Sequence, residues 1–129
     1  MLRVVCCSLV LFALSTLGCN NGGPYPVSGT VTFDGQPVES GEIKFVPLDT
    51  KLGPEGGRIE KGKFSLTAKA GKNRVEIDAS KPTGKKSKGA MGEDIDETAR
   101  YIPARYNQQS TLNEDITGSR SDVKYDLTK

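Results

Sequence analysis

The chemistry open to this chain is limited first by its cysteines and by the absence of histidine. Three cysteines and no histidine occur in 129 residues. Without histidine, Ser-His-Asp and Cys-His catalytic arrangements and His-ligated zinc are excluded, and three cysteines are too few for a four-cysteine zinc site. Cys6 and Cys7 lie within an apolar run, whereas Cys19 follows it. Cys19 is therefore the cysteine to explain, as half of a disulfide, a reactive thiol or an attachment point for lipid.

The apolar run before Cys19 is typical of a secretory signal. Arg3 supplies a short positive region, and the stretch from Val4 to Leu17 carries no charge. A membrane-spanning helix needs roughly 20 apolar residues, so this run is short for a span and has the length of a signal core. We predict a signal peptide over residues 1–18, which leaves Cys19 as the only cysteine of the mature chain. A single cysteine cannot close an internal disulfide.

The residues around Cys19 resemble the bacterial lipobox. Thr16-Leu17-Gly18-Cys19 places small residues before the cysteine, and Asn20 to Pro24 form a polar, Gly-rich stretch. In lipoproteins of this type the thiol receives diacylglycerol and the peptide is cut before the cysteine. The resemblance implies a lipid anchor on Cys19 and a flexible tether over residues 19–24. The alternative is an ordinary secretory signal cut nearby, with Cys19 unmodified.

The residue after Cys19 bears on location. By resemblance to the sorting rule of well-studied Gram-negative lipoproteins, Asn20 rather than Asp favours the outer over the inner membrane. The expected location is thus the cell envelope, after secretion across the inner membrane.

Tyr101, Arg105 and Tyr106 surround a proline in a segment without a strand pattern. Tyrosine rings can stack on a ligand and Arg105 can donate hydrogen bonds, so these three residues are the candidate ligand-binding site, with Tyr25 as a further contributor. The alternative is that Ile102 and Tyr106 pack a long connection onto the fold, since tyrosine can bury its ring and keep its hydroxyl wet.

Two charged clusters precede that segment. The basic cluster could bind anionic lipid or polysaccharide, and the acidic cluster could ligate calcium. The alternative is a solvated loop whose charges neutralise each other. The basic residues are Lys81, Lys85, Lys86 and Lys88, and the acidic ones are Glu93, Asp94, Asp96 and Glu97. The net charge of +2 gives no argument for nucleic-acid binding.

The pattern beyond the tether is that of β-structure. Apolar and polar residues alternate in short segments separated by turn residues, which predicts about seven strands in an antiparallel sandwich or barrel. The predicted strands cover residues 27–33, 41–46, 58–60, 63–67, 74–79, 112–117 and 122–128. Turns are predicted at Asp34-Gly35 and Lys61-Gly62. Between Ser80 and Gln109 the alternation fails, and we predict a long irregular connection.

Two stretches resemble the carboxypeptidase regulatory-like domain, which has a transthyretin-like (prealbumin-like) sandwich. They are "VSGTVTFDGQPVESGEIKFVP" and "GRIEKGKFSLTAKAGKNRVEI". The tail from Tyr101 resembles small planctomycete-type lipoproteins of this class. The resemblance covers residues 25 to 128 and implies one all-β sandwich domain over residues 25–129. Its motifs are mostly turn glycines and core positions, which specify fold rather than function.

The expected protein is a lipid-anchored envelope lipoprotein whose domain is a non-catalytic binding or structural module. The alternative is a carbohydrate-binding module that holds polysaccharide at the cell surface. Neither needs a cofactor or a metal. The expected partners are the membrane, through lipid on Cys19, and an envelope protein or polysaccharide.

Overall fold

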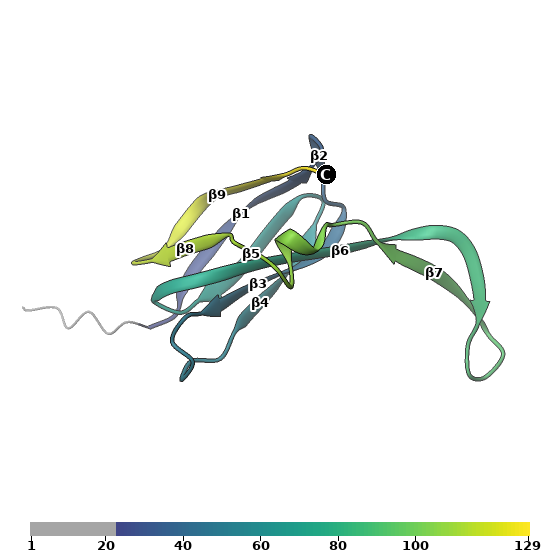
Figure 1. The fold of residues 1–129 in the computed structure, drawn as a ribbon, viewed down its shortest axis with the longest axis horizontal. Coiled ribbons are helices and arrows are strands. Elements are labelled where there is room, and N and C mark those ends of the chain that lie inside the picture. The colour runs from purple at the N-terminus through teal and green to yellow at the C-terminus, as the bar shows by residue number, and fades with distance from the viewer. Residues whose placement is uncertain (1–22) are drawn as a thin grey trace, which may run out of the picture.

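Nine β-strands and one turn of 3₁₀ helix make up residues 23–129, the part of the chain that the computed structural model describes (Figure 1). In chain order they are β1 (Tyr25–Phe33), β2 (Gln36–Pro37), β3 (Ser40–Pro47), β4 (Glu55–Glu60), β5 (Lys63–Ala68), β6 (Gly71–Lys88), β7 (Asp94–Arg100), η1 (Ala104–Tyr106), β8 (Asn113–Ile116) and β9 (Arg120–Leu127). The all-β prediction is confirmed, with nine strands over these residues in place of about seven.

The strands form one strongly curled sheet. Hydrogen-bonded neighbours follow the order β9-β1-β5-β4-β3-β6-β8, with β2 on the end of β1 and β7 on the far part of β6. The neighbours are antiparallel except for β1 and β9, which are parallel. β4 and β5 pair only beside their connecting turn, from Ile59 opposite Phe64 to Glu60 opposite Lys63. Past these two pairs the hydrogen-bonded ladder ends, although Gly57 of β4 still lies close to Ser65 and Leu66 of β5.

The core is built from the alternating apolar residues, as the sequence predicts. Ile43 of β3 lies opposite Ile77 of β6, and both side chains are fully buried. The other buried apolar residues are Val27, Val31, Val38, Phe45, Ile59, Phe64, Leu66, Ala68, Val75, Ala79, Ile102, Ile116, Val123, Tyr125 and Leu127. Because strand residues alternate between faces, the polar residues between them form the outer surface of the sheet.

Two predicted turns have the backbone geometry that their residues favour. Asp34 and Gly35 have φ of 49° and 80°, and Lys61 and Gly62 have φ of 50° and 75°. Two successive residues with positive φ form a type I′ turn, whose twist matches that of the flanking strands. The turns therefore fix the register of the β1–β2 and β4–β5 hairpins.

Gly29 allows β9 to lie against β1. A Cβ atom at this position would stand 1.9 Å from the carbonyl oxygen of Val123. The parallel register shifts between Val27 and Gly29, where the two backbones approach. Absence of a side chain at residue 29 is thus a condition for the last strand to join the sheet.

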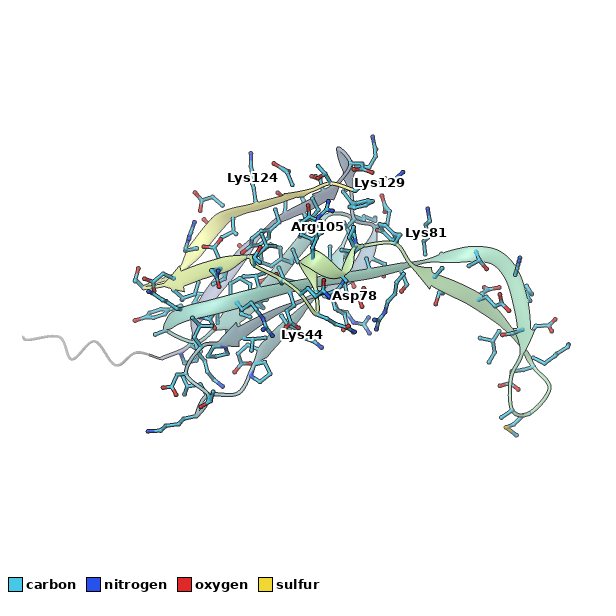
Figure 2. The ribbon with its side chains drawn as sticks, viewed as in Figure 1. Lys44, Asp78, Lys81, Arg105, Lys124 and Lys129 are labelled. Atoms are coloured by element: carbon cyan, nitrogen blue, oxygen red, sulfur yellow. The ribbon has the colours of Figure 1, made fainter. Side chains whose placement is uncertain are left out.

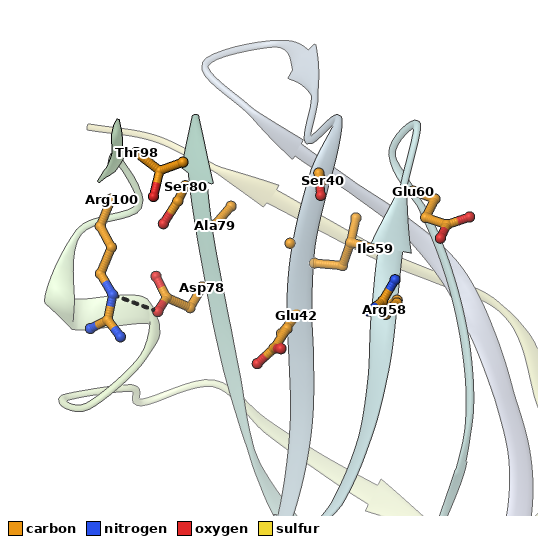
Figure 3. A pocket seen from close by; sticks show the side chains of 11 residues that line it. Ser40, Glu42, Arg58, Ile59, Glu60, Asp78, Ala79, Ser80, Thr98 and Arg100 are labelled. Atoms are coloured by element: carbon orange, nitrogen blue, oxygen red, sulfur yellow. Dashed lines mark ion pairs between the residues drawn. The ribbon is translucent and has the colours of Figure 1, made fainter. Parts of the chain in front are cut away.

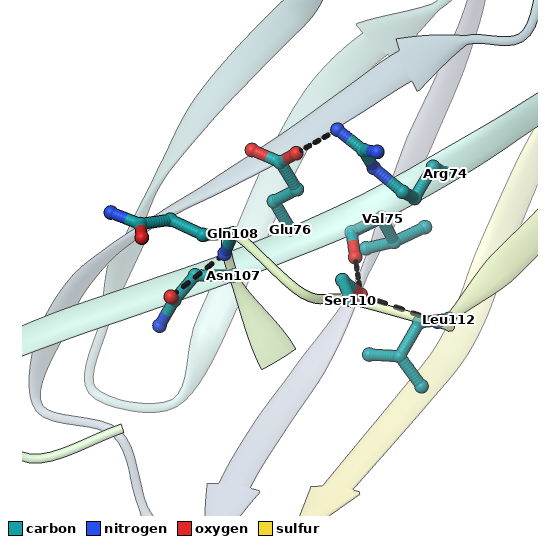
Figure 4. Close-up of polar contacts among 7 residues, drawn as sticks. All are labelled: Arg74, Val75, Glu76, Asn107, Gln108, Ser110 and Leu112. Atoms are coloured by element: carbon teal, nitrogen blue, oxygen red, sulfur yellow. Dashed lines mark hydrogen bonds and ion pairs between the residues drawn. The ribbon is translucent and has the colours of Figure 1, made fainter. Parts of the chain in front are cut away.

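The segment between β7 and β8 packs against β6 and bonds to the chain that follows β9. Ile102 is buried, and the Val75 N–H donates a hydrogen bond to the Leu112 carbonyl at 2.8 Å. The Ser110 hydroxyl donates to the Val75 carbonyl and accepts from the Leu112 N–H (Figure 4). Residues 101–112, which we call the covering segment, are thus packed onto the core.

The predicted irregular connection after Ser80 is wrong over residues 80–100, where the chain forms a two-stranded arm. β6 leaves the body and pairs with β7 from Ser80 opposite Arg100 to Lys88 opposite Asp94. The register shifts between Pro82 and Lys86, where Gly84 has φ of 81°. The ribbon bends along this outer part (Figure 1). The arm was not predicted from the sequence because its strands lack the alternation of apolar and polar residues. Both faces of the arm are exposed to solvent, so neither face needs apolar side chains.

Candidate functional site

Cys19 lies outside the described residues, as do the signal peptide and most of the predicted tether. Within residues 23–129, no helix is long and apolar enough to cross a membrane. Gly23 and Pro24 precede the first strand, which begins at Tyr25. An anchor on Cys19 would therefore be six positions from the start of β1.

Tyr101 stands at the base of the arm, directly after β7. Its ring meets Phe33 edge to face, with 5.5 Å between ring centres. The Lys81 ammonium lies over the Tyr101 ring at 5.5 Å from its centre, and Lys81 marks the point where the arm leaves the body (Figure 2). Burial, followed by the nearby charge of Glu39, raises the pKa of Tyr101. The ring is therefore enclosed on two sides by this chain's own residues.

Arg105 and Tyr106 lie together on η1 and hold the end of the chain. The Arg105 guanidinium stacks over the Tyr106 ring at 4.9 Å, and its Nη2 donates to the Thr128 carbonyl at 2.5 Å. The Tyr106 hydroxyl oxygen accepts a 3.1 Å hydrogen bond from the Thr128 N–H. The Tyr106 hydroxyl also lies 3.5 Å from Thr128 Oγ1, and the hydrogen bonds with the Thr128 side chain and backbone, with Arg105 adding to them, lower the pKa of Tyr106 to about 8. The pair thus fixes the residues after β9 to the covering segment.

The predicted binding residues are only partly brought together. Tyr101 contacts Phe33, at the end of β1, whereas Tyr25 begins that strand, about 26 Å away at the rise of a β-strand. Cations of the chain itself cover the ring faces of Tyr101 and Tyr106. This arrangement gives more support to the packing alternative than to a stacking platform.

A row of charged side chains on the outer face of the sheet was not anticipated from the sequence. Arg58 of β4, Glu42 of β3 and Asp78 of β6 occupy neighbouring register positions on three adjacent strands. Arg100 of β7 ends the row, with its Nε 3.1 Å from Asp78 Oδ2 (Figure 3). In the sequence, this row is marked by charged residues at the outward positions of each strand. The sequence does not show that these positions are neighbours, because that depends on the order of the strands in the sheet.

This row lines a concavity of about 480 Å³ at the foot of the arm. Ser40, Ser80 and Thr98 add hydroxyl groups to its wall (Figure 3). The second carboxylate oxygen of Asp78, Oδ1, is shielded from solvent and has no hydrogen-bond partner within residues 23–129. The surface is therefore polar, mixed in charge and able to accept hydrogen bonds.

A second hollow lies beside the neighbouring row of the same face and shares Glu42, Asp78 and Arg100 with the first. Lys44 of β3 lies opposite Glu76 of β6, and the Glu76 carboxylate pairs with Arg74 (Figure 4). Asn107 and Gln108 of the covering segment close this side, around a further space of about 180 Å³. Three elements distant in sequence thus meet along one charged surface.

The two charged clusters lie opposite each other along the arm. Lys86 pairs in register with Asp96 and Lys88 with Asp94, where Nζ and Oδ1 are 2.6 Å apart. Opposite charges at facing positions of a ladder stabilise a pair of strands by roughly 0.2–1 kcal/mol. Across residues 23–129, no three metal-ligating side chains come together. The arrangement supports the self-neutralising alternative, within a ribbon rather than a loop.

Comparison with protein-family models, with curated proteins and with solved structures gives no match to this chain. What the protein does has to be inferred from its own residues and geometry.

Proposed function

We propose that this chain is a lipid-anchored lipoprotein of a bacterial cell envelope whose β-domain is a non-catalytic binding or structural module. The apolar leader and Cys19 support the anchor, since two or three acyl chains hold a protein to a bilayer where one is marginal. Asn20 after the cysteine favours the outer membrane. We propose that the strongly curled sheet is a variant of the transthyretin-like sandwich, because only two register pairs join β4 to β5 and so link the group β9-β1-β5 to the group β4-β3-β6-β8.

The observation that carries this proposal is the placement of the arm. Tyr25, where the chain enters the fold, and the turn of the arm after Lys88 lie at opposite ends of the long axis (Figure 1). β6 has 18 residues, a contour of about 60 Å at the rise of a strand. A protein held at its N-terminus would present such an arm away from the bilayer.

The exposure of the arm supports a role in binding another molecule. From Ser80 to Lys88 each residue is exposed, and on β7 Glu97 alone is partly covered. An isolated two-stranded ribbon is marginally stable in water and adds nothing to the core. Such a structure, placed beside the charged concavity, supports a role in holding an envelope partner.

A polysaccharide partner at Tyr101, Arg105 and Tyr106 is the alternative, and the geometry gives it less support. A cation of the chain itself lies over one face of each ring, and a sugar that stacked on that face would have to displace Lys81 or Arg105. We therefore favour an envelope protein as the partner of the arm and concavity. Glycan binding that is lost on Tyr101→Ala with Tyr106→Ala would reverse this preference.

Two experiments test the proposed function. Mass spectrometry of the mature protein should find acyl chains on Cys19, and Cys19→Ser should release the protein from membranes. An unmodified N-terminus at another residue would rule out the anchor. Crosslinking in native cells should then recover a partner with the complete chain, but not with an arm-shortened variant in which Asn-Gly replaces residues 83–97. Equal recovery with both would rule out the arm as the contact.

A further inference from the structure

At the end of the fold where β1 begins, the β3–β4 loop and the β5–β6 turn are hydrogen-bonded to each other and form one surface. Tyr25 pairs with Ala68, directly before the turn that leads into β6. The Leu48 N–H donates to the Lys72 carbonyl at 2.9 Å, and Lys69 Nζ donates to the Gly53 carbonyl at 3.0 Å. These bonds join the β3–β4 loop, residues 48–54, to the β5–β6 turn. We call this surface the tether end.

A buried amide holds the turn of the tether end in shape. Asn73 is fully buried, and its Nδ2 donates hydrogen bonds of 2.9 Å to the carbonyls of both Lys69 and Gly71. Lys69 also pairs with Glu55 at 3.1 Å. Asn73 Oδ1 has no hydrogen-bond partner within residues 23–129, so the two bonds from Nδ2 hold the turn. The β3–β4 loop is therefore seated on a defined support.

Two leucines of the β3–β4 loop are exposed to solvent. Leu48 is 57% exposed and Leu52 is 39% exposed. Over residues 23–129 the other large apolar side chains with comparable exposure are Met91 and Ile95, both on the outer part of the arm. The exposed apolar groups thus gather at the two ends of the long axis, and the leucines lie where the chain leads back to Cys19.

The chain between Cys19 and Tyr25 sets how far the tether end can stand from an anchor. Six peptide steps of at most about 3.6 Å span roughly 20 Å when fully extended. Acyl chains on Cys19 would therefore keep the tether end close to the headgroups of the bilayer. A tether this short gives the β3–β4 loop a high effective concentration at the bilayer surface. Even a weak contact between the loop and the lipid would then keep the loop on the bilayer.

The charges at the tether end nearly balance. Three lysines face two carboxylates of the two connections and Asp115 of the neighbouring strand β8, which lies opposite Lys72. This argues against attraction to anionic lipid as the main force. The lysines are Lys51, Lys69 and Lys72, and the carboxylates are Asp49, Glu55 and Asp115. Lysine stems can lie along an apolar surface while their ammonium groups stay in water. A contact here would depend on the leucines.

We propose that the tether end is the membrane-contacting face of the anchored protein, with Leu48 and Leu52 seated among the lipid headgroups. The proposal rests on the anchor at Cys19 and adds an orientation to it. The occupant is a lipid bilayer surface, chosen because of the short segment after Cys19 and the leucines beside it. The arm then points away from the bilayer.

Fluorescence quenching tests this contact, because the chain has no tryptophan of its own. The acylated, complete mature protein carrying Leu52→Trp is placed in phosphatidylcholine vesicles whose acyl chains are brominated. Its tryptophan emission should fall by half or more relative to unbrominated vesicles. The matched control is Met91→Trp on the arm, whose emission should stay unchanged. The loss for Leu52→Trp should also persist in high salt and without anionic lipid.

The outcomes separate the contact from the anchor. Equal emission in both vesicles for Leu52→Trp and for Leu48→Trp, in protein whose Cys19 acylation is verified by mass, overturns the contact and leaves the anchor standing. Lack of acylation overturns both. A dimer of the unacylated mature chain in solution that Leu48→Ser with Leu52→Ser converts to a monomer would assign the surface to a second copy and also overturn the contact.

Discussion

The hydroxyl of Ser110 donates a hydrogen bond to the carbonyl oxygen of Val75, which joins the covering segment to the central strand β6 (Figure 4). Both residues are buried, and they are 35 positions apart in the sequence. Residues 101–112 therefore belong to the folded body, although they contain no strand. The Tyr106–Thr128 contact fixes the same segment to the chain after β9.

Ser110→Ala should destabilise the fold by about 1–3 kcal/mol, because the change leaves the Val75 carbonyl without its donor and the Leu112 N–H without its acceptor. Urea denaturation followed by circular dichroism measures the free energy of unfolding. The matched control is Thr111→Ala at the exposed neighbouring position, which should stay within about 0.5 kcal/mol of the parent. Equal stability of the two variants would contradict a structural role for the hydroxyl.

Gly29→Ala should cost about 3 kcal/mol or more, at the upper end for overpacking, because the new methyl group would overlap the Val123 carbonyl oxygen. β9 would have to move away from β1, so amide hydrogen exchange should accelerate in β9. Gly118→Ala is the matched control, since a Cβ there meets nothing within 4 Å. Thermal unfolding of the two variants gives the comparison. A Gly29→Ala protein as stable as the control would show that β9 does not pack as described.

Tyr106 should titrate near pH 8, because the bonds from Thr128 and the stacked Arg105 favour its ionised form. The fold lowers its pKa from 10, so between about pH 8 and pH 10 the folded state binds fewer protons than the unfolded state. Stability relative to Tyr106→Phe should therefore rise with pH across this window, and the contribution should be lost as the pH falls through 8. Tyrosinate absorbance as a function of pH detects the ionisation, and Tyr106→Phe identifies it.

A buried tyrosine provides the contrast within the same titration. Burial, together with the Glu114 carboxylate that accepts its hydrogen bond at 3.1 Å, raises the pKa of Tyr125. Tyr125 should therefore ionise only after Tyr106. A reversed order would contradict the environments described for both residues.

Replacing residues 83–97 by Asn-Gly should leave the free energy of unfolding within about 0.5 kcal/mol of the parent, because none of the removed side chains is buried. Pro82 and Thr98 face each other in register, so a two-residue turn can join them. Calorimetry measures the effect. A loss of several kcal/mol would show that the arm contributes to the core.

The body of the fold was predictable where one face of a strand is buried. Phe64 and Leu66, like Val123 and Leu127, are inward at every second position, and this local signal needs no knowledge of the neighbouring strands. The type I′ turn at Lys61-Gly62 was predictable for the same reason, since a positive φ is encoded by the turn residues themselves.

The arm and the parallel strand depend on information that no short window contains. The signal for the arm was the symmetry of its charges about a glycine turn, with Lys86 and Lys88 on one side and Asp94 and Asp96 on the other. The β1–β9 pairing joins residues far apart in sequence, such as Thr32 and Asp126, whose side chains bond at 2.8 Å.

The charged row that lines the concavity could not be predicted because its residues lie on strands that are separate in the sequence. Glu42, Arg58 and Asp78 are unremarkable outward residues on three separate strands, and they become neighbours only through the order β4-β3-β6. Tyr101 and Tyr106 were recognisable as an unusual pair, but the cations that cover their rings come from contacts that the spacing does not reveal.

The continuity of β6 between body and arm has a mechanical consequence. A partner that pulls on the tip loads the same strand that is hydrogen-bonded to β3 within the body. If the opposing force enters at Tyr25, both forces act nearly along the strands (Figure 1). The inter-strand bonds are then loaded in shear, so several must break together rather than one after another. Under this loading, force at the tip of the arm would be carried through the sheet to Tyr25 before the strands separate one after another.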